Sequence, residues 1–251
     1  MKITVTGAAG GIGLATVQLA IEYGHKVIAV DLPIADFSTL QHENVEIILA
    51  DLSKQSDRDK VVEASGGVEG LVNCAGAMIM KPIFEFTMDE IHKLFEINFE
   101  STWDLTSRIG SKMPDGGSIV NLSSTGSKYV SNSQVGPYAA TKAAINSLTR
   151  TFAFEFAQKN VRVNAVAPGI INTPMQDKVL KELNLQVKVT KEFRQNAFSV
   201  INQYTLPKQA ELRGNLNRTS PAFKLRGSPS PPATLVQAQE CPPCFPGRRG
   251  C

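Results

Sequence analysis

The stretch KITVTGAAGGIG, residues 2–13, decides the fold of this chain. Lys2–Thr6 has the apolar and β-branched composition of a strand, and Gly7, Gly11 and Gly13 follow at a G-x-x-x-G-x-G spacing. Glycine allows a turn to take unusual dihedral angles and lets backbone N–H groups approach phosphate oxygens. The stretch therefore predicts a strand, a nucleotide-binding turn and a helix in that order. A glycine cluster alone is also compatible with a tight strand-to-helix turn that binds nothing.

The same alternation continues along the chain. Further strands are predicted at Lys26–Val30, Val45–Leu49, Gly70–Asn73, Ser118–Leu122 and Arg162–Ala167, and helices at Ile12–Tyr23, Asp57–Ala64, Asp89–Lys112 and Tyr138–Lys159. This pattern predicts an α/β fold: a single domain built on a Rossmann-type, doubly wound parallel sheet with helices on both faces. Right-handed crossovers in such a sheet place ligands outside the carboxyl ends of the strands.

The bulk composition is that of an ordinary globular protein. Of the 251 residues, 42% are hydrophobic and 20% are charged, so one domain with a sizeable core is expected. The net charge of +3 is unevenly distributed, because residues 207–251 carry seven Lys or Arg against two Glu, which is +5 and leaves −2 for residues 1–206. The basic charge therefore belongs to the tail, and no nucleic-acid surface is indicated on the body.

Neither a secretory leader nor a membrane span is predicted. The first apolar run gives way to glycine at Gly7, and no later run approaches the roughly 20 apolar residues that a span needs. Of the four cysteines, only Cys74 lies outside the tail, which favours a reducing compartment without a disulfide framework. The expected location is the cytoplasm.

The strand–helix pattern fades after about residue 181, although Lys191–Asn202 is compatible with a helix. We assign residues 1–206 to the domain and residues 207–251 to a tail rich in Pro, Arg and Ser. The tail holds eight of the 14 prolines and has no strand or helix period, which favours a disordered segment. A second hypothesis is that the tail is translated out of the ancestral reading frame, which the coding DNA would test.

A carboxylate ends the second predicted strand. Asp31 can accept hydrogen bonds from an adenosine ribose there and would repel a 2′-phosphate, which favours NAD over NADP as the cofactor. The alternative is a strand-end carboxylate that begins a turn before Pro33. Small and polar residues also follow the third and fourth strands, where they would lie near the adenine and the ribose: Asp51, Leu52, Asn73, Ala75 and Gly76. Asp51 could instead cap the next helix.

A serine, a tyrosine and a lysine form the second informative pattern. Tyr138 and Lys142 are four residues apart at the start of a predicted helix, so their side chains project from one face. A tyrosine pKa near about 10 is too high for a base at neutral pH, and a nearby ammonium lowers it. Ser124 follows the predicted strand Ser118–Leu122, where its hydroxyl can hold a substrate oxygen. A lone Tyr-x-x-x-Lys is more often structural, and the dinucleotide-type sheet is what favours acid–base chemistry here.

Taken together, these residues resemble the short-chain dehydrogenase/reductase family. The resemblance runs in unbroken order over roughly residues 1–181 and is carried by Thr6–Gly13, Asn73–Gly76, Asn98, Ser124, Tyr138–Lys142 and Pro168-Gly169. It implies NAD(P)-dependent oxidation of an alcohol or reduction of a carbonyl, in a homotetramer or homodimer.

The resemblance also implies roles for individual residues. Tyr138 matches the general acid/base, Lys142 the partner that lowers its pKa and binds the ribose, and Ser124 the serine that steadies the reacting oxygen, with Ser123 as an alternative. Asn98 matches an asparagine that bends a helix and binds a water linking Lys142 to solvent. The set implied to bind the cofactor is Gly7, Gly11, Ile12, Gly13, Asp31, Asp51, Leu52, Asn73, Ala75, Gly76, Tyr138, Lys142, Pro168, Gly169 and Thr173.

Two hypotheses of function follow. The favoured one is an NAD-dependent oxidoreductase for a secondary alcohol such as a polyol, diol or sugar alcohol, because residues 172–176 resemble members that act on such substrates. The alternative is a catalytically inactive NAD-binding or regulatory protein, because the family's final strand is missing from the sequence and its loss would expose a sheet edge. No metal site is expected, since the three histidines are isolated and Cys241-Pro-Pro-Cys244 lacks a second ligand pair.

Overall fold

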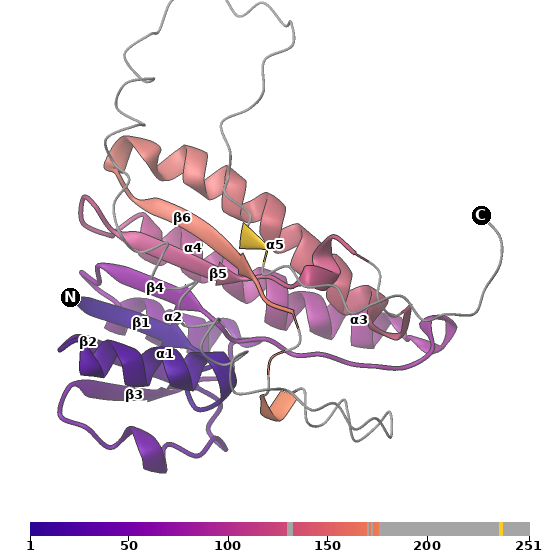
Figure 1. Cartoon of the computed structure of the whole chain (residues 1–251), viewed down its shortest axis with the longest axis horizontal. Coiled ribbons are helices and arrows are strands. Elements are labelled where there is room, and N and C mark those ends of the chain that lie inside the picture. The colour runs from indigo at the N-terminus through magenta and orange to yellow at the C-terminus, as the bar shows by residue number, and fades with distance from the viewer. Residues whose placement is uncertain (130–132, 170, 172, 176–235, 238–251) are drawn as a thin grey trace, which may run out of the picture.

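The computed structural model describes residues 1–129, 133–169, 171, 173–175 and 236–237 and has the predicted α/β architecture (Figure 1). Its strands are β1 (Lys2–Thr6), β2 (Lys26–Asp31), β3 (Val45–Leu49), β4 (Gly70–Asn73), β5 (Ser118–Leu122), β6 (Arg162–Ala167) and β7 (Val236–Gln237). Its α-helices are α1 (Gly11–Glu22), α2 (Gln55–Ala64), α3 (Met88–Phe95), α4 (Ser101–Gly110) and α5 (Gly136–Glu155).

The strands form one parallel sheet in the order β3-β2-β1-β4-β5-β6-β7. Val5 in the central strand β1 is paired with Ala29 of β2 on one side and with Val72 of β4 on the other. From β1 the chain builds outward to β3, then returns and builds outward again from β4, so the strand order reverses between β1 and β4. A doubly wound sheet binds its ligand outside the carboxyl ends of the strands at such a reversal. The topology confirms the predicted Rossmann-type fold and locates the site.

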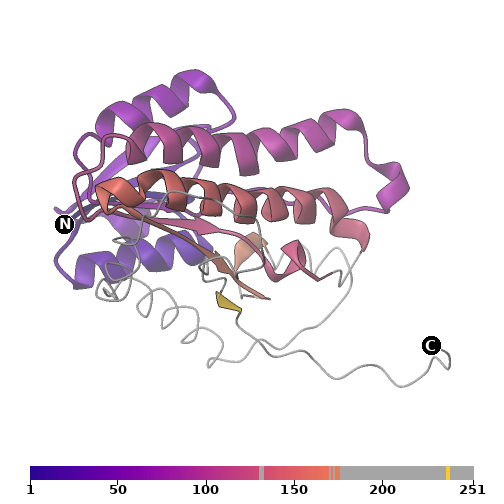
Figure 2. The same cartoon turned by 90° about the horizontal axis from the view of Figure 1, so that it is seen from above.

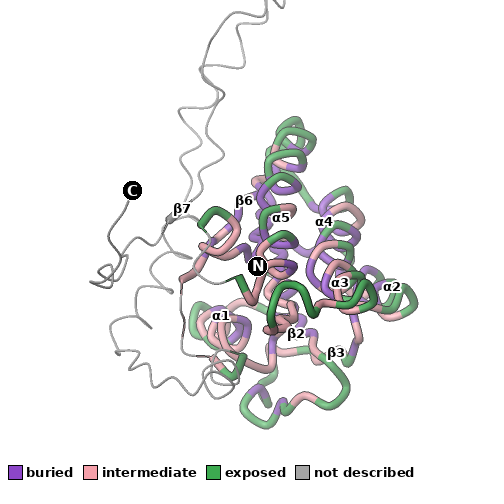
Figure 3. Tube along the Cα trace, turned by 90° about the vertical axis from the view of Figure 1, so that its right-hand side faces the viewer, coloured by how far each residue is buried: buried purple, intermediate pink, exposed green. Residues whose placement is uncertain are grey.

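Helices cover both faces of this sheet, as Figures 2 and 3 show. Strand β2 illustrates why, because alternate side chains of a strand point to opposite faces. Val27 and Ala29 pack with α1 on one face, whereas Ile28 and Val30 pack with α2, α4 and α5 on the other. Strands buried on both faces need continuous apolar runs, which is the pattern that the sequence shows.

The helix predicted over Asp89–Lys112 is divided in the structure. A π-helical segment, Glu96–Glu100, separates α3 from α4. The hydroxyl of Thr102, in the first turn of α4, donates to the carbonyl oxygen of Asn98 in this segment at 2.8 Å, and such side-chain bonds compete with the regular helical pattern. The prediction of one uninterrupted helix was therefore wrong, whereas the irregularity implied at Asn98 is present.

Most of the C-terminal tail lies outside the described residues, and so does the possible helix Lys191–Asn202. Within the tail, Val236 and Gln237 form β7, which pairs with Val166 and Ala167 of β6. This short strand was not predicted, and it pairs with part of the edge of β6 that the missing final strand was expected to leave open. Among the described helices, none is long and apolar enough to cross a membrane.

Candidate active site

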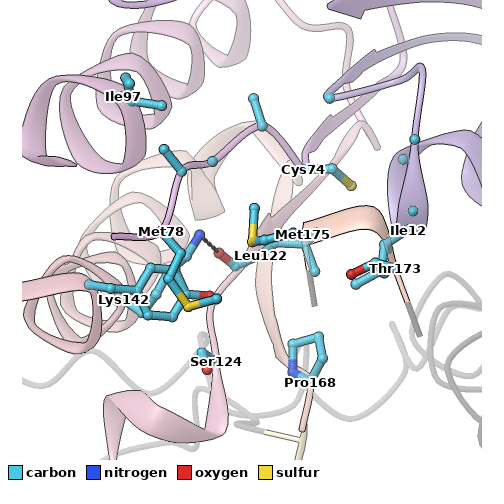
Figure 4. Close-up of a pocket in the computed structure, with 18 of the residues that line it drawn as sticks. Ile12, Cys74, Met78, Ile97, Leu122, Ser124, Lys142, Pro168, Thr173 and Met175 are labelled. Atoms are coloured by element: carbon cyan, nitrogen blue, oxygen red, sulfur yellow. Dashed lines mark hydrogen bonds between the residues drawn. The ribbon is translucent and has the colours of Figure 1, made fainter. Parts of the chain in front are cut away.

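A pocket of about 600 Å³ lies at the carboxyl ends of β1, β4 and β5 (Figure 4). Its volume is in the range of small-molecule and cofactor sites, roughly 300–1,000 Å³. The predicted site residues that line it are Gly7, Gly11, Ile12, Gly13, Asp31, Asp51, Leu52, Ala75, Gly76, Ser124, Tyr138, Lys142, Pro168, Gly169 and Thr173. Two further predicted residues, Asn73 and Asn98, are absent from this lining and lie behind it.

The glycine turn is closely packed. Gly7 has a φ of +65°, and a Cβ added to it would come within 2.8 Å of the backbone nitrogen of Ala75. A Cβ on Gly13 would overlap the carbonyl oxygen of Gly7. Glycine is therefore required at both positions, because the turn, the end of β4 and the first turn of α1 share this space. The alternative that these glycines serve only a tight turn explains their packing but not their position in a pocket wall.

The same turn has the features of an anion site. The N-cap of α1 is Gly10, which offers no side-chain cap to the first helical turn. The N–H groups at the start of a helix lack intrahelical partners, and the helix dipole adds partial positive charge there. Because Gly11, Ile12 and Gly13 line the pocket, these amides fit a pyrophosphate. The pocket thus has a shape and a donor set that suit a dinucleotide.

Asp31 borders both the turn and the pocket. Its Oδ2 accepts from the backbone N–H of Ala9 at 2.9 Å, and its Oδ1 accepts from the N–H of Leu32 at 2.8 Å. These two bonds fix the carboxylate at the end of β2, in a position consistent with the predicted ribose contact.

Asp51 has a structural partner as well as a place in the pocket wall. Its Oδ1 accepts from the Ser53 hydroxyl at 2.8 Å and from the Ser53 N–H at 3.2 Å. The hydrogen bond from the Ser53 hydroxyl is the main reason that the pKa of Asp51 is lowered. The alternative that Asp51 caps the next helix was wrong, because the N-cap of α2 is Lys54 and has no side-chain cap, whereas the contact of Asp51 to the adenine remains a prediction.

Asn73 uses its side chain inside the protein. Its Nδ2 donates to Asn121 Oδ1 at 2.8 Å and to Thr106 Oγ1 at 3.1 Å, and Asn121 Nδ2 in turn donates to Thr149 Oγ1 at 3.0 Å. These contacts link β4 and β5 to α4 and α5 behind the pocket. A cofactor contact from Asn73 can therefore come from its backbone, and its predicted role remains a prediction.

Ser124 and Tyr138 are brought together as predicted. They lie 14 positions apart in sequence, yet the Ser124 hydroxyl is hydrogen-bonded to the Tyr138 phenol. Ser124 Oγ also accepts from the N–H of Gly126 at 3.1 Å. Burial raises the pKa of the Tyr138 phenol, and the hydrogen bond with Ser124 opposes that shift. Ser123 does not compete for this role, because its hydroxyl donates to the carbonyl oxygen of Lys142 at 3.1 Å.

Lys142 is buried beside this pair. Its Nζ donates to the carbonyl oxygen of Leu122 at 2.8 Å, drawn as the dashed line in Figure 4, and lies 5.7 Å from the centroid of the Tyr138 ring. Burial lowers the pKa of the Lys142 ammonium to about 8. The lowered tyrosine pKa predicted from the Tyr-x-x-x-Lys spacing is not present in this structure, because the ammonium is directed at Leu122 and burial dominates at the phenol.

Asn98 connects the π-helical segment to the catalytic helix. Its Oδ1 accepts from the N–H of Ala77 at 2.7 Å, and its Nδ2 donates to Thr141 Oγ1 at 3.0 Å. The Thr141 hydroxyl donates to the carbonyl oxygen of Tyr138 at 2.7 Å. A Cβ on Gly76 would lie 3.2 Å from Asn98 Oδ1 and 3.4 Å from Lys142 Nζ, so Asn98 and the ammonium are close neighbours. Asn98 thus positions α5 from behind the pocket.

The remaining predicted cofactor residues, Pro168, Gly169 and Thr173, follow β6 and form another part of the pocket wall. The carbonyl oxygen of Pro168 accepts from the N–H of Thr125 at 3.0 Å, which fixes the end of β6 beside Ser124. The Thr173 side chain lies against the glycine turn, since a Cβ on Gly11 would come within 3.0 Å of its methyl group. This wall closes the pocket on the side of the predicted nicotinamide contact.

Sequence reasoning did not identify the apolar pocket residues Met78, Met80, Ile97 and Val135, to which the segment 172–176 adds Met175. They come from the loop after β4, the π-helical segment, the 3-10 helix Ser133–Val135 and the helical residues 174–175, where no hydrophobic period marks them. A usable signal was the position of Met78 and Met80 directly after the fourth strand, at the ligand-binding edge of the sheet.

Comparison with known proteins agrees with this geometry. The model of the short chain dehydrogenase family matches residues 1–184. Human L-xylulose reductase is 34% identical over 182 residues, which are 69% of this chain and 73% of that relative. The solved short-chain dehydrogenase/reductase (glucose/ribitol dehydrogenase) from Brucella melitensis superposes with a TM-score of 0.67 at 34% identity, covering 72% of this chain and 77% of the other.

A further solved structure, BdcA in complex with NADPH, has a TM-score of 0.66 at 26% identity and covers 70% of this chain and 76% of its own. The family model spans far more than half of the sequence, and the matched region includes both the glycine turn and the catalytic helix. We conclude that this chain belongs to the short-chain dehydrogenase family, whose members are oxidoreductases that use nicotinamide cofactors.

Proposed function

We propose that the protein is an NAD-dependent oxidoreductase that interconverts a secondary alcohol and its ketone. The observation that carries the proposal is the hydrogen-bonded Ser124–Tyr138 pair in the same pocket as the glycine turn, with buried Lys142 beside it. A bound nicotinamide would supply the hydride acceptor or donor. The residues of the chain then have to bind the substrate oxygen, orient it and move one proton.

Each of the three side chains has a defined task in this proposal. Tyr138 Oη takes the proton of the alcohol hydroxyl in oxidation and returns it to the ketone oxygen in reduction. Ser124 Oγ holds the same oxygen in line with Tyr138, and such orientation supplies a large part of the rate. Lys142 in this proposal stabilises the phenolate and donates to the ribose, as the family resemblance implies.

The direct test follows the absorbance of the reduced nicotinamide during incubation of the protein with NAD or NADP and a panel of secondary alcohols, and during the reverse reaction with ketones. Turnover that depends on Tyr138 supports the proposal. No turnover, together with a rise of the thermal midpoint when NAD is added, supports instead the alternative of an inactive nucleotide-binding protein.

The preference for NAD rests on the charge of Asp31. Replacing Asp31 by asparagine keeps an acceptor for the N–H of Ala9 and removes the negative charge. We expect the KM for NADP to fall by about tenfold, which corresponds to roughly 1.4 kcal/mol, because a 2′-phosphate would no longer meet a carboxylate. Steady-state kinetics with both cofactors measure this ratio. Asp36→Asn, on an exposed loop outside the pocket lining, is the matched control; an unchanged cofactor ratio in Asp31→Asn would contradict the assignment.

The direction of the reaction should depend on pH. Reduction needs the protonated phenol, and because burial raises the pKa of Tyr138 the phenol keeps its proton at neutral pH. Oxidation needs the phenolate, whose fraction grows about tenfold per pH unit below that pKa. We expect kcat/KM for oxidation to rise from pH 6 towards about 8 and to bend above it, where Lys142 loses its charge. Reduction should stay nearly flat over the same range, and an oxidation rate that falls with pH would contradict the role of Tyr138.

We also propose a cytoplasmic homo-oligomer. Phe152 and Phe156 stack inside the core with their centroids 5.3 Å apart, whereas Phe154 on α5 is 86% exposed and Trp103 on α4 is 49% exposed. These two exposed apolar side chains support the expectation of a subunit contact, which light scattering on the purified protein would measure. The single free cysteine in the described part, Cys74, is in keeping with a reducing compartment.

A further inference from the structure

The carboxylates of the pocket lining lie at one end. This end holds Asp31, Asp51 and Ser53, where the adenosine half of the cofactor is expected, together with apolar side chains such as Val30 and Leu52. We call the other end, around Ser124 and Tyr138, the apolar end, because the described lining there carries no carboxylate and includes Met78. Met78 extends toward Lys142 and Ser124 in Figure 4. The same lining includes the apolar residues Met80, Ile97, Val135 and Met175, and we call these four together with Met78 the methionine wall.

Among the residues that the structure describes, few side-chain hydrogen-bonding groups remain for a substrate at this end. The hydroxyl of Ser123 donates to the carbonyl oxygen of Lys142, and Lys142 Nζ donates to that of Leu122. Among the described lining residues near Lys142, the side-chain hydroxyls left are those of Ser124, Thr125 and Tyr138. Ser124 and Thr125 follow the end of β5, and Tyr138 lies on α5. In the proposed reaction, Ser124 and Tyr138 bind the one substrate oxygen that reacts. A substrate with several further hydroxyls would have to bury them against thioether and aliphatic carbon, without replacing the hydrogen bonds lost from water.

The described part of the lining also offers an anionic substrate few basic side chains. Lys142 is the one basic side chain among the described residues that line the pocket. The next basic side chain along the apolar loop, Lys81, is paired with both carboxylate oxygens of Glu90 at 2.9 and 2.8 Å and is not part of the lining. Those bonds hold Lys81 and its charge away from the substrate end.

Methionine makes this wall adaptable as well as apolar. Its unbranched side chain has three rotatable bonds, and its sulfur makes favourable contacts with aromatic rings. Flexible methionine surfaces repack around different apolar groups. We infer that the substrate of the proposed reaction is an apolar ketone, or the matching secondary alcohol, with an alkyl or aryl group that packs on the methionine wall. This inference rests on the proposed function and differs from the polyol expected from residues 172–176, which stays a prediction because Asn172 and Gln176 lie outside the described residues.

The test compares ketones with matched skeletons. Pentan-2-one and xylulose have the same five-carbon chain with the carbonyl at the same position and differ in their hydroxyls, and octan-2-one and 4-phenylbutan-2-one extend the apolar part. We expect kcat/KM to be at least about 100-fold higher for pentan-2-one than for xylulose, and to rise further, by about tenfold or more, for the two longer ketones.

A matched pair of variants tests whether the methionine wall causes the preference for apolar ketones. Met78→Gln is nearly isosteric and puts an amide into the apolar end. It should lower kcat/KM for octan-2-one by about tenfold, and so reduce the ratio of kcat/KM for octan-2-one to kcat/KM for xylulose. Met88→Gln makes the same change at an exposed position of α3 outside the pocket lining and should leave both values unchanged. Thermal melting of both variants shows whether a loss comes from unfolding, and Met78→Thr serves as a second polar substitution if Met78→Gln does not fold.

The outcomes separate the two proposals. Turnover of xylulose at a rate equal to or above that of pentan-2-one, abolished by Tyr138→Phe, would overturn the apolar substrate and leave the oxidoreductase standing. A preference for long ketones that Met78→Gln and Met78→Thr leave intact would overturn the role of the methionine wall. No Tyr138-dependent turnover with any ketone or alcohol would overturn the proposed function and this inference with it.

Discussion

Replacing Tyr138 by phenylalanine is expected to lower kcat/KM by about 10²–10⁴-fold in both directions of the reaction, because general acid–base catalysis contributes that much. The variant removes one oxygen atom. That atom is hydrogen-bonded to Ser124 and lies on a helix that Asn98 and Thr141 hold in place. The ring can keep its packing, and the ammonium of Lys142 keeps its bond to Leu122. The loss should therefore fall on chemistry, and NAD should still raise the thermal midpoint of the variant.

The matched control is Tyr23→Phe, which makes the same chemical change at a 59% exposed position after α1. It should change neither kcat/KM nor the midpoint measurably. Equal activity of Tyr138→Phe and the parent protein would remove Tyr138 from the mechanism. A large loss of NAD binding in Tyr138→Phe would show that the phenol serves the cofactor site more than the proton transfer.

The strands and their order along the chain could be predicted because the sequence patterns that mark them are local. Strands β4 and β5 have the bounds expected from the sequence, since a parallel strand buried between helices is a continuous apolar run with polar or small residues at its ends. The division of the long helix at Glu96–Glu100 could not be predicted from periodicity. It depends on hydroxyl-to-carbonyl bonds such as that from Thr102 to Asn98, which change the backbone pattern without changing the apolar pattern.

The sequence predicted which side chains of the candidate site lie together, but it did not predict the direction in which the tyrosine pKa is shifted. Spacing is enough to place Tyr138 and Lys142 on one helix face, and strand order is enough to bring Ser124 beside them. The direction of the ammonium toward Leu122 and the burial of the phenol are tertiary facts, and they reverse the expected direction of the tyrosine pKa. The methionine wall was missed for the same reason, because only the fold brings Met78 and Met175 into one pocket.

A methyl group at Gly13 should remove dinucleotide binding. The Cβ of Gly13→Ala would overlap the carbonyl oxygen of Gly7, and this neighbour is backbone that cannot rotate away. Gly7 itself has no room to retreat, because a Cβ placed on it would already be 2.8 Å from the backbone nitrogen of Ala75. The turn must therefore open, and the amides of the first turn of α1 move away from the pyrophosphate position. We expect the Kd for NAD to rise by at least about 100-fold, or roughly 2.7 kcal/mol, and the free energy of unfolding to fall by about 1–3 kcal/mol.

Calorimetric titration with NAD and denaturant unfolding measure the two effects separately, and the unfolding curve gives the folded fraction to which the binding refers. Gly66→Ala is the matched control, since Gly66 lies on an exposed turn after α2 where an added Cβ would meet its nearest neighbour, the carbonyl oxygen of Glu63, at an ordinary 3.5 Å. That variant should bind NAD normally and change stability by less than about 0.5 kcal/mol. Normal NAD binding by folded Gly13→Ala would place the dinucleotide away from this turn, and the proposed function would then lose its cofactor site.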